Sequence, residues 1–238
     1  MLHWDILPKA QGTLWGQFVS LPEHFVLYGG TALALQLGHR SSVDFDFFSA
    51  KPIEPRQLYE TLDFLAKGRI TQEERNTLTV QARTEDGPVA VSFFGGLGLR
   101  CVDLPAKVPP GVRLAGVRDI FGCKCAAIQQ RESLKDLQDI SALLRHGHSL
   151  AEGLGCSRAI YGGSFNPRIT LMALSYPPAL EGLPAEDRQL LTQAVEAIQN
   201  VPPVAVEPLG RIGEVEPVQS KGQTMDASSN PVAKLKQE

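Results

Sequence analysis

The feature that most constrains this chain is a pair of glycines followed by an Asp-x-Asp sequence, with thirteen residues between Gly30 and Asp44. Gly29 and Gly30 close a short apolar run, and a helical pattern of apolar residues follows them. Asp44 and Asp46 lie among apolar residues in a pattern typical of a strand. Because side chains alternate along a strand, both carboxylates are expected on one face and the intervening phenylalanine on the other. The spacing predicts strand, glycine turn, helix and acidic strand in succession.

This combination of residues favours a site for a metal ion and a phosphate. Two neighbouring carboxylates repel each other, and a divalent cation between them relieves the repulsion. Mg²⁺ prefers oxygen ligands and commonly takes one or two carboxylates together with substrate phosphates. Free N–H groups at a helix N-terminus attract phosphate. We therefore predict Asp44 and Asp46 as catalytic Mg²⁺ ligands, and a nucleoside triphosphate (NTP) held by Gly29, Gly30 and Thr31 through backbone N–H groups and the Thr31 hydroxyl.

Each of these assignments has a structural alternative. The acids can form a turn or a capping pair, and the glycines can form a plain turn from strand to helix. Arg40, just before the acidic strand, is predicted to contact phosphate or to pair with an aspartate, and a purely structural role is the alternative.

Two segments of the chain resemble a known family. The glycine pair with the Asp-x-Asp sequence resembles the hG[GS]-x(9–13)-Dx[DE] signature of the DNA polymerase β-type nucleotidyltransferase superfamily. The stretch GGTALALQLGHRSSVDFDFF is similar to the AbiEii/AbiGii-type toxin family, the toxins of type IV toxin–antitoxin pairs. Residues 123–140, CKCAAIQQRESLKDLQDI, resemble that family's helical K-x-A-A-I…R…KD-x-x-D segment. The two matches together anchor roughly residues 20 to 145.

The resemblance adds two catalytic residues. It implies that Lys124 contacts the nucleotide phosphates, where an ammonium group balances their charge. It also implies that Asp136 is a site residue, as a base or as an orienter of the acceptor or of Lys124. Asp139 lies one helical turn further and shares the face of Asp136. The alternatives are a solvent-exposed lysine and carboxylates that merely favour a helix N-terminus.

The chain departs from the superfamily at one position. Many members bring a third carboxylate from a later strand, which helps to hold two metal ions and to deprotonate the attacking hydroxyl. The strand expected at residues 89–94 offers Ser92 there, which cannot serve as that base at neutral pH. Asp136, Asp103, Glu85 or the substrate then does this work, or the enzyme is weakened.

Composition narrows the remaining possibilities. The net charge of −3 argues against a broadly basic nucleic-acid binder, although a local basic stripe would suffice for RNA. The chain has no run of about 18 apolar residues and no signal-peptide pattern, so no membrane contact is expected. The four cysteines lack a zinc spacing and are predicted to be reduced thiols in a cytoplasmic protein. The candidate stripe, whose alternative is a solvated helix face, comprises Arg113, Arg118, Lys124, Arg131 and Lys135.

The fold is predicted as α+β: a small mixed sheet in a nucleotidyltransferase core (1–115), a helical C-terminal part (116–200) and a mobile, disordered Pro-rich tail (201–238). Apolar periodicity and turn residues place the individual elements. Helices are expected near residues 3–20, 31–37, 55–67, 118–130, 134–144 and 187–198, and strands near 25–28, 43–48, 69–72, 77–82, 89–94 and 112–114.

The sequence thus predicts an Mg²⁺-dependent nucleotidyltransferase that transfers a nucleoside monophosphate (NMP) from an NTP to an acceptor hydroxyl. The resemblance implies a toxin-like role, RNA or tRNA as the acceptor, and a cognate antitoxin as the partner. Two alternatives stay open. One is an NTP-binding module that has lost turnover, and the other is nucleotidylation of a small molecule.

Overall fold

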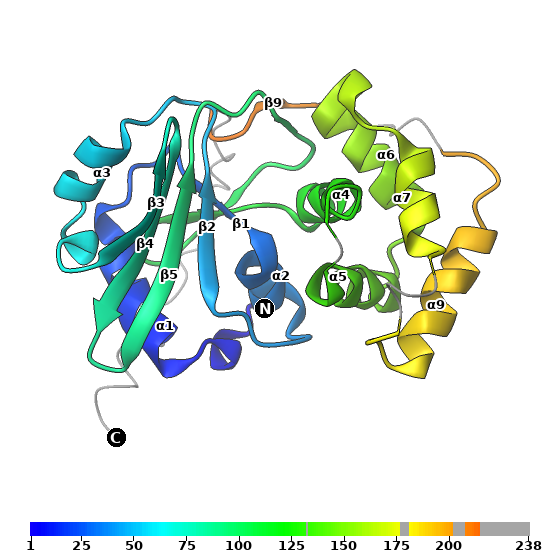
Figure 1. The fold of residues 1–238 in the computed structure, drawn as a ribbon, viewed down its shortest axis with the longest axis horizontal. Coiled ribbons are helices and arrows are strands. Elements are labelled where there is room, and N and C mark those ends of the chain that lie inside the picture. Colours follow the sequence, from blue (N-terminus) through cyan, green and yellow to red (C-terminus); the bar gives the residue numbers. More distant parts are fainter. Residues whose placement is uncertain (132, 177–180, 202–207, 215–238) are drawn as a thin grey trace, which may run out of the picture. The chain divides into compact units, whose positions relative to one another are not determined.

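The computed structural model in Figure 1 describes residues 1–131, 133–176, 181–201 and 208–214. The chain divides into two compact units. The first unit contains Met1–Gly98, Leu104–Ala115 and the described residues from Ile212, and the second contains Leu99–Asp103 and Gly116–Arg211. The domain boundaries predicted at residues 115 and 200 stay a prediction. The short segment 99–103 packs with the second unit, although it lies before residue 115 in the chain.

A mixed sheet forms the centre of the first unit. Its strands lie in the order β3-β4-β5-β2-β1-β8-β7. The pairs β1–β8 and β2–β5 are parallel, and the other neighbours are antiparallel. This arrangement, with helices beside it, confirms the predicted α+β class. The strands are β1 (Val26–Tyr28), β2 (Asp44–Phe48), β3 (Arg69–Glu74), β4 (Thr77–Thr84), β5 (Gly87–Phe94), β7 (Ala106–Val108) and β8 (Val112–Leu114).

The helices of the first unit are shorter than the sequence pattern predicts. The helix expected over 3–20 is broken at Pro8, which precedes α1 and lacks the N–H that a helix interior needs. The helix expected over 55–67 ends where Leu62 adopts extended backbone. The elements are η1 (Trp4–Ile6), α1 (Lys9–Trp15), η2 (Gly16–Ser20), α2 (Gly29–Leu37), α3 (Pro55–Thr61) and η3 (Asp63–Leu65), where η denotes a 3₁₀ helix.

An aromatic cluster fills the core of this unit. Phe18 is buried and meets three further phenylalanines edge to face. Its ring centroid lies 4.9 Å from that of Phe45, 5.2 Å from that of Phe47 and 5.1 Å from that of Phe64. Such pairs contribute about 0.5–1.5 kcal/mol each beyond their burial. The core therefore holds the inward face of β2 rigidly.

The second unit is helical. Two of its helices, α6 and α7, have no counterpart among the predicted elements. The glycines of α6 argue against a helix, but Gly153 packs so tightly on Phe121 that an added Cβ would lie 2.6 Å from its ring. The helices are α4 (Val117–Ala127), α5 (Leu134–Arg145), α6 (Leu150–Tyr161), η4 (Gly162–Ser164), α7 (Pro167–Leu174) and α9 (Ala185–Glu196), and the strands β6 (Arg100–Cys101) and β9 (Gly210–Arg211) pair with each other.

The predicted Pro-rich tail falls mostly on residues 202–207 and 215–238, which lie outside the described residues. In its described part Gly210–Arg211 forms β9, and Ile212 is 1% exposed. Within the described ranges, no helix has the length and apolarity needed to span a membrane.

Candidate functional site

The turn from β1 to α2 brings glycine backbone against an acidic side chain. The helix α2 begins at Gly29, with Tyr28 as the residue before its first turn. Gly29 has φ +72°, in the left-handed region that favours glycine. A Cβ added to Gly29 would lie 2.5 Å from Oδ2 of Asp46. Only a residue without a side chain allows this carboxylate to lie beside the first N–H groups of the helix, which have no partner within it.

The two acids share one face of β2, as the sequence predicts. Along the strand, Phe45 and Phe47 are fully buried, whereas Asp44 is exposed and Asp46 is half-buried. Across the described residues, the Asp44 carboxylate has no hydrogen bond or ion pair. An exposed carboxylate beside a half-buried one, both on a strand fixed by aromatic packing, is a suitable pair of oxygen donors for a divalent cation.

The Thr31 side chain has a different partner from the predicted one. Its hydroxyl is buried and donates a hydrogen bond of 2.5 Å to the backbone carbonyl of Asp44. This bond ties the first turn of α2 to the beginning of β2. The hydroxyl therefore positions the glycine turn relative to the acids, and the backbone N–H of Thr31 is the group left for a phosphate.

A cation lies over the same turn. A Cβ at Gly30 would lie 2.7 Å from Nη2 of Arg40 and 3.0 Å from Oγ of Ser42. Nη1 of Arg40 donates to the carbonyl of Ser41 at 3.0 Å, which holds the guanidinium in place. A guanidinium beside helix N–H groups provides the charge and the donors that a phosphate needs. The structure thus brings Gly29, Gly30, Thr31, Arg40 and Asp46 together.

The position expected for a third carboxylate lies beside Asp46. In the parallel pairing of β2 and β5, Ser92 is the register partner of Asp46. Ser92 is 9% exposed, and its Oγ accepts a hydrogen bond of 3.3 Å from Thr79. Of the alternative acids, Glu85 lies exposed at the β4–β5 turn, and Asp103 pairs with Arg118 in the second unit. In the described part of the chain, no three His, Cys, Asp or Glu side chains cluster as metal ligands.

A second group of predicted residues forms a buried ion cluster in the helical unit. Nζ of Lys124 lies 2.6 Å from Oδ1 of Asp136 and 2.7 Å from Oδ2 of Asp139. All three side chains are at least nine-tenths buried. Arg131 reaches the other oxygen of Asp136 at 3.0 Å, and Ser133 caps the helix that carries both acids. The alternative of a solvent-exposed lysine is therefore wrong for Lys124, because two carboxylates compensate its burial.

The predicted basic stripe does not form. Arg113 is 4% exposed on β8 and donates to the carbonyls of Glu23 and Gly213. Lys124 is buried as well, and Arg118 pairs with two acids. Arg131 and Lys135 remain as exposed members of the set. Sequence proximity suggested one surface, but β8 and the helical unit take these side chains into different surroundings.

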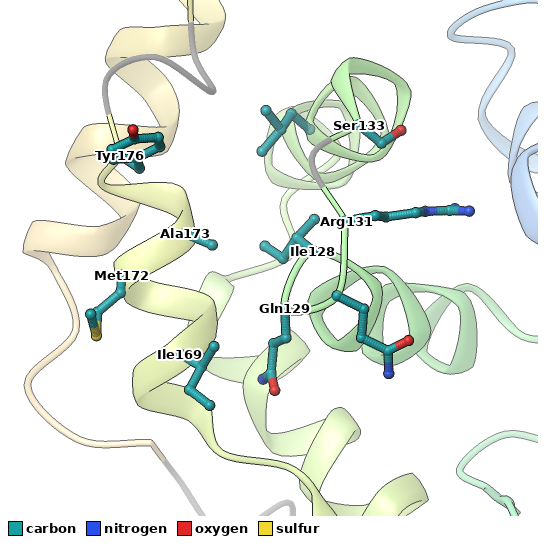
Figure 2. Close-up of a pocket in the computed structure, with 10 residues that line it drawn as sticks. Ile128, Gln129, Arg131, Ser133, Ile169, Met172, Ala173 and Tyr176 are labelled. Atoms are coloured by element: carbon teal, nitrogen blue, oxygen red, sulfur yellow. The ribbon is translucent and has the colours of Figure 1, made fainter.

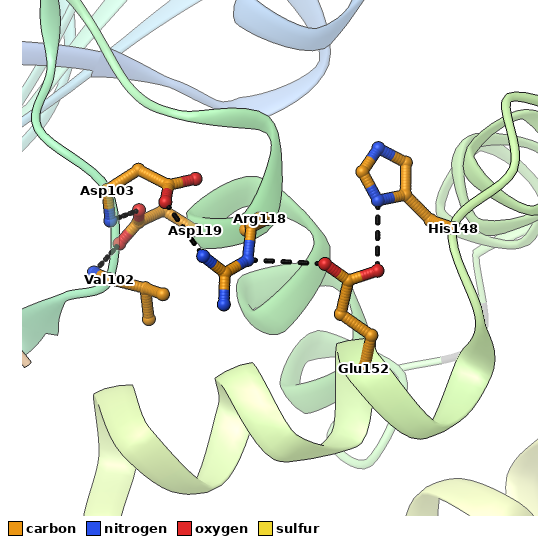
Figure 3. A network of polar contacts seen from close by, with 6 residues as sticks. All are labelled: Val102, Asp103, Arg118, Asp119, His148 and Glu152. Atoms are coloured by element: carbon orange, nitrogen blue, oxygen red, sulfur yellow. Dashed lines mark hydrogen bonds and ion pairs between the residues drawn. The ribbon is translucent and has the colours of Figure 1, made fainter. Parts of the chain in front are cut away.

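Sequence reasoning missed a buried carboxylate with its own polar network (Figure 3). Asp119 is fully buried and accepts backbone N–H bonds from Val102 at 2.8 Å and Asp103 at 2.7 Å. Burial raises the pKa of Asp119 to about 6, although these two hydrogen bonds oppose the shift. Arg118 links Asp103 to Glu152, with both ion pairs at 3.2 Å. The network holds the segment Leu99–Asp103 on α4, and no spacing in the sequence indicates it.

A pocket of about 440 Å³ also lies in the helical unit (Figure 2). It opens between the turn that follows α4 and the helix α7, whose Ile169 and Ala173 face Ile128 and Gln129. Its lining is mainly apolar, from Ile128, Ile169, Met172 and Ala173, with Tyr176 at one end. None of the predicted site residues lines it.

Comparisons with known proteins place the chain in a family. The family described as "Nucleotidyl transferase AbiEii toxin, Type IV TA system" matches residues 14–160. An uncharacterized protein of Aquifex aeolicus (strain VF5), aq_aa25, is 38% identical over 152 residues, which are 61% of this chain and 71% of that protein.

Two solved structures have a similar chain path over most of their length. MenT4, a nucleotidyltransferase toxin from Mycobacterium tuberculosis H37Rv, is 14% identical, with 80% of this chain and 91% of that one covered and a TM-score of 0.49. JHP933 from Helicobacter pylori is 20% identical, with 82% and 92% covered and the same TM-score, 0.49. Because the family match covers more than half of its residues, the chain belongs to the AbiEii family of nucleotidyltransferase toxins of type IV toxin–antitoxin systems.

Proposed function

We propose that the protein is an Mg²⁺-dependent nucleotidyltransferase that transfers an NMP from an NTP to a hydroxyl of RNA, with tRNA as the expected kind of acceptor. The observation that carries the proposal is the contact between the glycine turn and Asp46, with Arg40 over Gly30. This contact supports a single site in which a triphosphate and a metal ion bind next to each other. A cognate antitoxin and a cytoplasmic location belong to the same proposal and rest on the family.

The residues present fit a magnesium ion. Asp44 and Asp46 offer hard oxygen donors on one face, and the absence of a Cβ at Gly29 lets the Asp46 carboxylate lie against the glycine turn. When bound, Mg²⁺ would neutralise phosphate charge and orient the leaving group.

The side chains and backbone would contribute positioning and charge. Backbone N–H groups of Gly30 and Thr31 donate to the triphosphate, and the Arg40 guanidinium neutralises it. The acceptor oxygen then bonds to the α-phosphorus. The bond from the α-phosphorus to the bridging oxygen breaks, and pyrophosphate leaves with that electron pair. The hydroxyl proton passes to a base or to solvent.

Lys124 and Asp136 enter the proposal as catalytic residues through the family segment that they occupy. The ion pair between Lys124 and Asp136 limits how Lys124 could contact the nucleotide. Because two carboxylates already hold the ammonium of Lys124, it would reach a phosphate only by giving up one of them. Asp136, held by Lys124 and Arg131, would orient Lys124 and not act as the base.

A second candidate is an NTP-binding module without turnover. The observation that favours it is Ser92, the register partner of Asp46 where a third carboxylate is expected. This candidate retains Mg²⁺-dependent NTP binding and yields no product with any acceptor. Transfer to a small molecule is a third candidate, which the acidic net charge of −3 favours mildly.

The experiment that separates these candidates uses α-labelled NTPs, Mg²⁺ and total cellular RNA. The variant Asp44→Asn is compared with Asp63→Asn, which changes an exposed aspartate of the same unit. Labelled RNA is expected from the wild type and Asp63→Asn, and none from Asp44→Asn. A folded Asp44→Asn protein that still labels RNA would refute the proposal. NTP binding without any labelled product would support the binding module.

A further inference from the structure

One face of the sheet beside the acidic pair carries polar side chains and is partly open. Along β4 every second residue is buried, namely Leu78, Val80 and Ala82. On that face α1 and η3 pack against the strands. The residues between them, Thr77, Thr79 and Gln81, are half-buried and Arg83 is exposed. Alternation along the strand therefore leaves a face that is polar on β4, and the strands β3, β4 and β5 lie side by side with β2 (Figure 1). On β5 the same face carries Pro88, Ala90, Ser92 and Phe94.

The strand register connects this polar face to the two acids. Asp44 pairs with Ala90, Ala90 with Gln81, and Gln81 with Arg69. Register partners share a face, so these four residues form one row from β2 to β3. Three strand spacings of about 4.8 Å give the row a length of about 14 Å. The neighbouring row runs from Asp46 through Ser92 and Thr79 to Gln72.

The side chains in these rows form a shallow path with one cation at its outer end and another beside it. Beside the acids stand the small Ala90 and Ser92, which project little from the sheet. Arg69 is exposed at the outer end of the first row, on β3. Arg83 is exposed on β4, two residues beyond Gln81 and in register with Pro88. Among the residues that the structure describes, the guanidinium of neither arginine takes part in an ion pair or hydrogen bond. Two exposed guanidiniums without acidic partners are available to phosphate groups.

Besides Asp44 and Asp46, this face carries the acidic residue Glu74, at the end of β3 opposite to Arg69. Glu74 pairs in register with Thr77 and accepts a hydrogen bond of 3.0 Å from Gln72. A polyanion would thus avoid the end near Glu74 and lie along the row that begins at Arg69. That row leads to Asp44, whose carboxylate has no partner within the described part of the chain.

We propose that this sheet face binds the acceptor as a single strand of RNA. Arg69 and Arg83 hold its phosphates, and the amide of Gln81 and hydroxyl of Thr79 hydrogen-bond ribose 2′-hydroxyls. The strand runs along the row to place its reacting hydroxyl beside Asp44. The proposal rests on the proposed function and deepens it, because a path of three strand spacings with Arg69 at its end and Arg83 beside it fits a chain with repeated phosphates better than a small molecule.

The test measures binding separately from transfer. A fluorescent single-stranded oligoribonucleotide is titrated with the full-length protein, and anisotropy is recorded over a series of salt concentrations. The double variant Arg69→Ala/Arg83→Ala is compared with Arg56→Ala/Lys67→Ala, which removes two exposed charges elsewhere on the same unit. We expect at least a tenfold loss of affinity in the first variant only. In this variant the slope of the logarithm of the binding constant against the logarithm of the salt concentration should be smaller in magnitude by about 1.4, since each phosphate contact on a single strand contributes about 0.7.

Several outcomes would overturn this proposal. Equal affinities in the two double variants would exclude the sheet face, and equal binding of the matching oligodeoxyribonucleotide would exclude RNA as the occupant. A further variant, Ala90→Glu, puts a negative charge in the path and should weaken RNA binding while circular dichroism confirms the fold.

Mg²⁺-dependent NTP binding is measured in the same proteins and should not change in Arg69→Ala/Arg83→Ala. A wild type that binds RNA through this face but transfers no NMP would contradict the proposed function alone. A wild type that labels RNA equally well without the two arginines would contradict the sheet-face proposal alone.

Discussion

Gly29 touches the carboxylate of Asp46 so closely that an added Cβ would lie 2.5 Å from Oδ2. This contact fixes the turn between β1 and α2 against the acidic strand, and it requires both the small size and the positive φ of glycine. A phosphate on the helix N-terminus and a cation on Asp46 would therefore be neighbours.

Replacement of this glycine should damage the site in two ways. In Gly29→Ala the left-handed backbone costs about 1–2 kcal/mol, and the methyl group displaces the Asp46 side chain. We expect Mg²⁺-dependent NTP binding to fall at least tenfold, as measured by calorimetry. The control is Gly98→Ala in the same unit, where an added Cβ meets no atom within 4 Å. Equal NTP affinity in the two variants would contradict the proposed geometry.

The buried ion cluster should stabilise the helical unit. Lys124→Met removes one cation from between Asp136 and Asp139 and leaves their carboxylates under-compensated. Loss of one partner from a buried ion pair costs about 3–5 kcal/mol, and we expect a decrease of that size in the free energy of unfolding, measured with urea. Lys135→Met, an exposed lysine of α5, should change it by less than about 0.5 kcal/mol. Similar stabilities for the two variants would mean that Lys124 is not held as described.

The raised pKa of Asp119 predicts how stability depends on pH. Its folded-state pKa of about 6 lies above the ordinary value of 3.8, so the folded state binds the proton more tightly than the unfolded state. The contribution of Asp119 to stability is therefore complete below about pH 4 and is lost as the pH rises through about 6. Between pH 5 and 8, we expect the wild type to lose about 1 kcal/mol relative to Asp119→Asn. A difference between the two proteins that is constant with pH would show that Asp119 does not titrate in this range.

Ser92 offers a gain-of-function test. Ser92→Asp places a third carboxylate at the register position of Asp46. Repulsion between the acids should lower the free energy of unfolding without metal, and millimolar Mg²⁺ should restore it, because a bound ion stabilises the folded state. If the missing acid limits turnover, NMP transfer should rise at the same time. The control for the added negative charge is Ser41→Asp, at an exposed position. Ser42 is not used because its Oγ lies close to Gly30 in the glycine turn. Destabilisation that Mg²⁺ does not reverse would argue against a metal at this place.

Local patterns predicted the sheet and the acidic pair well. Asp44, Phe45, Asp46 and Phe47 alternate along β2, so the aspartates lie on one face and the phenylalanines on the other. In the structure both phenylalanines are buried, and both aspartates are at least partly exposed. The cap of α5 is local in the same way, because the Ser133 side chain accepts a hydrogen bond from the backbone N–H of Asp136 within one turn.

The remaining features depend on residues far apart in the chain. The ion pairs of Lys124 span twelve and fifteen residues, and Asp119 takes its hydrogen bonds from residues before α4. The sequence pattern does not predict α6, because its glycines lower helix propensity. The reason for Gly153 is its close approach to Phe121, a residue more than thirty positions earlier in the chain. The sequence predicts that the Thr31 hydroxyl contacts the phosphate, whereas in the structure this hydroxyl donates to the backbone carbonyl of Asp44.

The most direct test of the account is the position of a metal ion in crystals soaked with Mn²⁺ and a non-hydrolysable NTP. Mn²⁺ replaces Mg²⁺ and is located by its anomalous scattering. We predict a peak bound by carboxylate oxygens of both Asp44 and Asp46 at about 2.1 Å, with the triphosphate on the first N–H groups of α2. A nucleotide bound elsewhere, or a metal ion that contacts neither aspartate, would contradict the central claim.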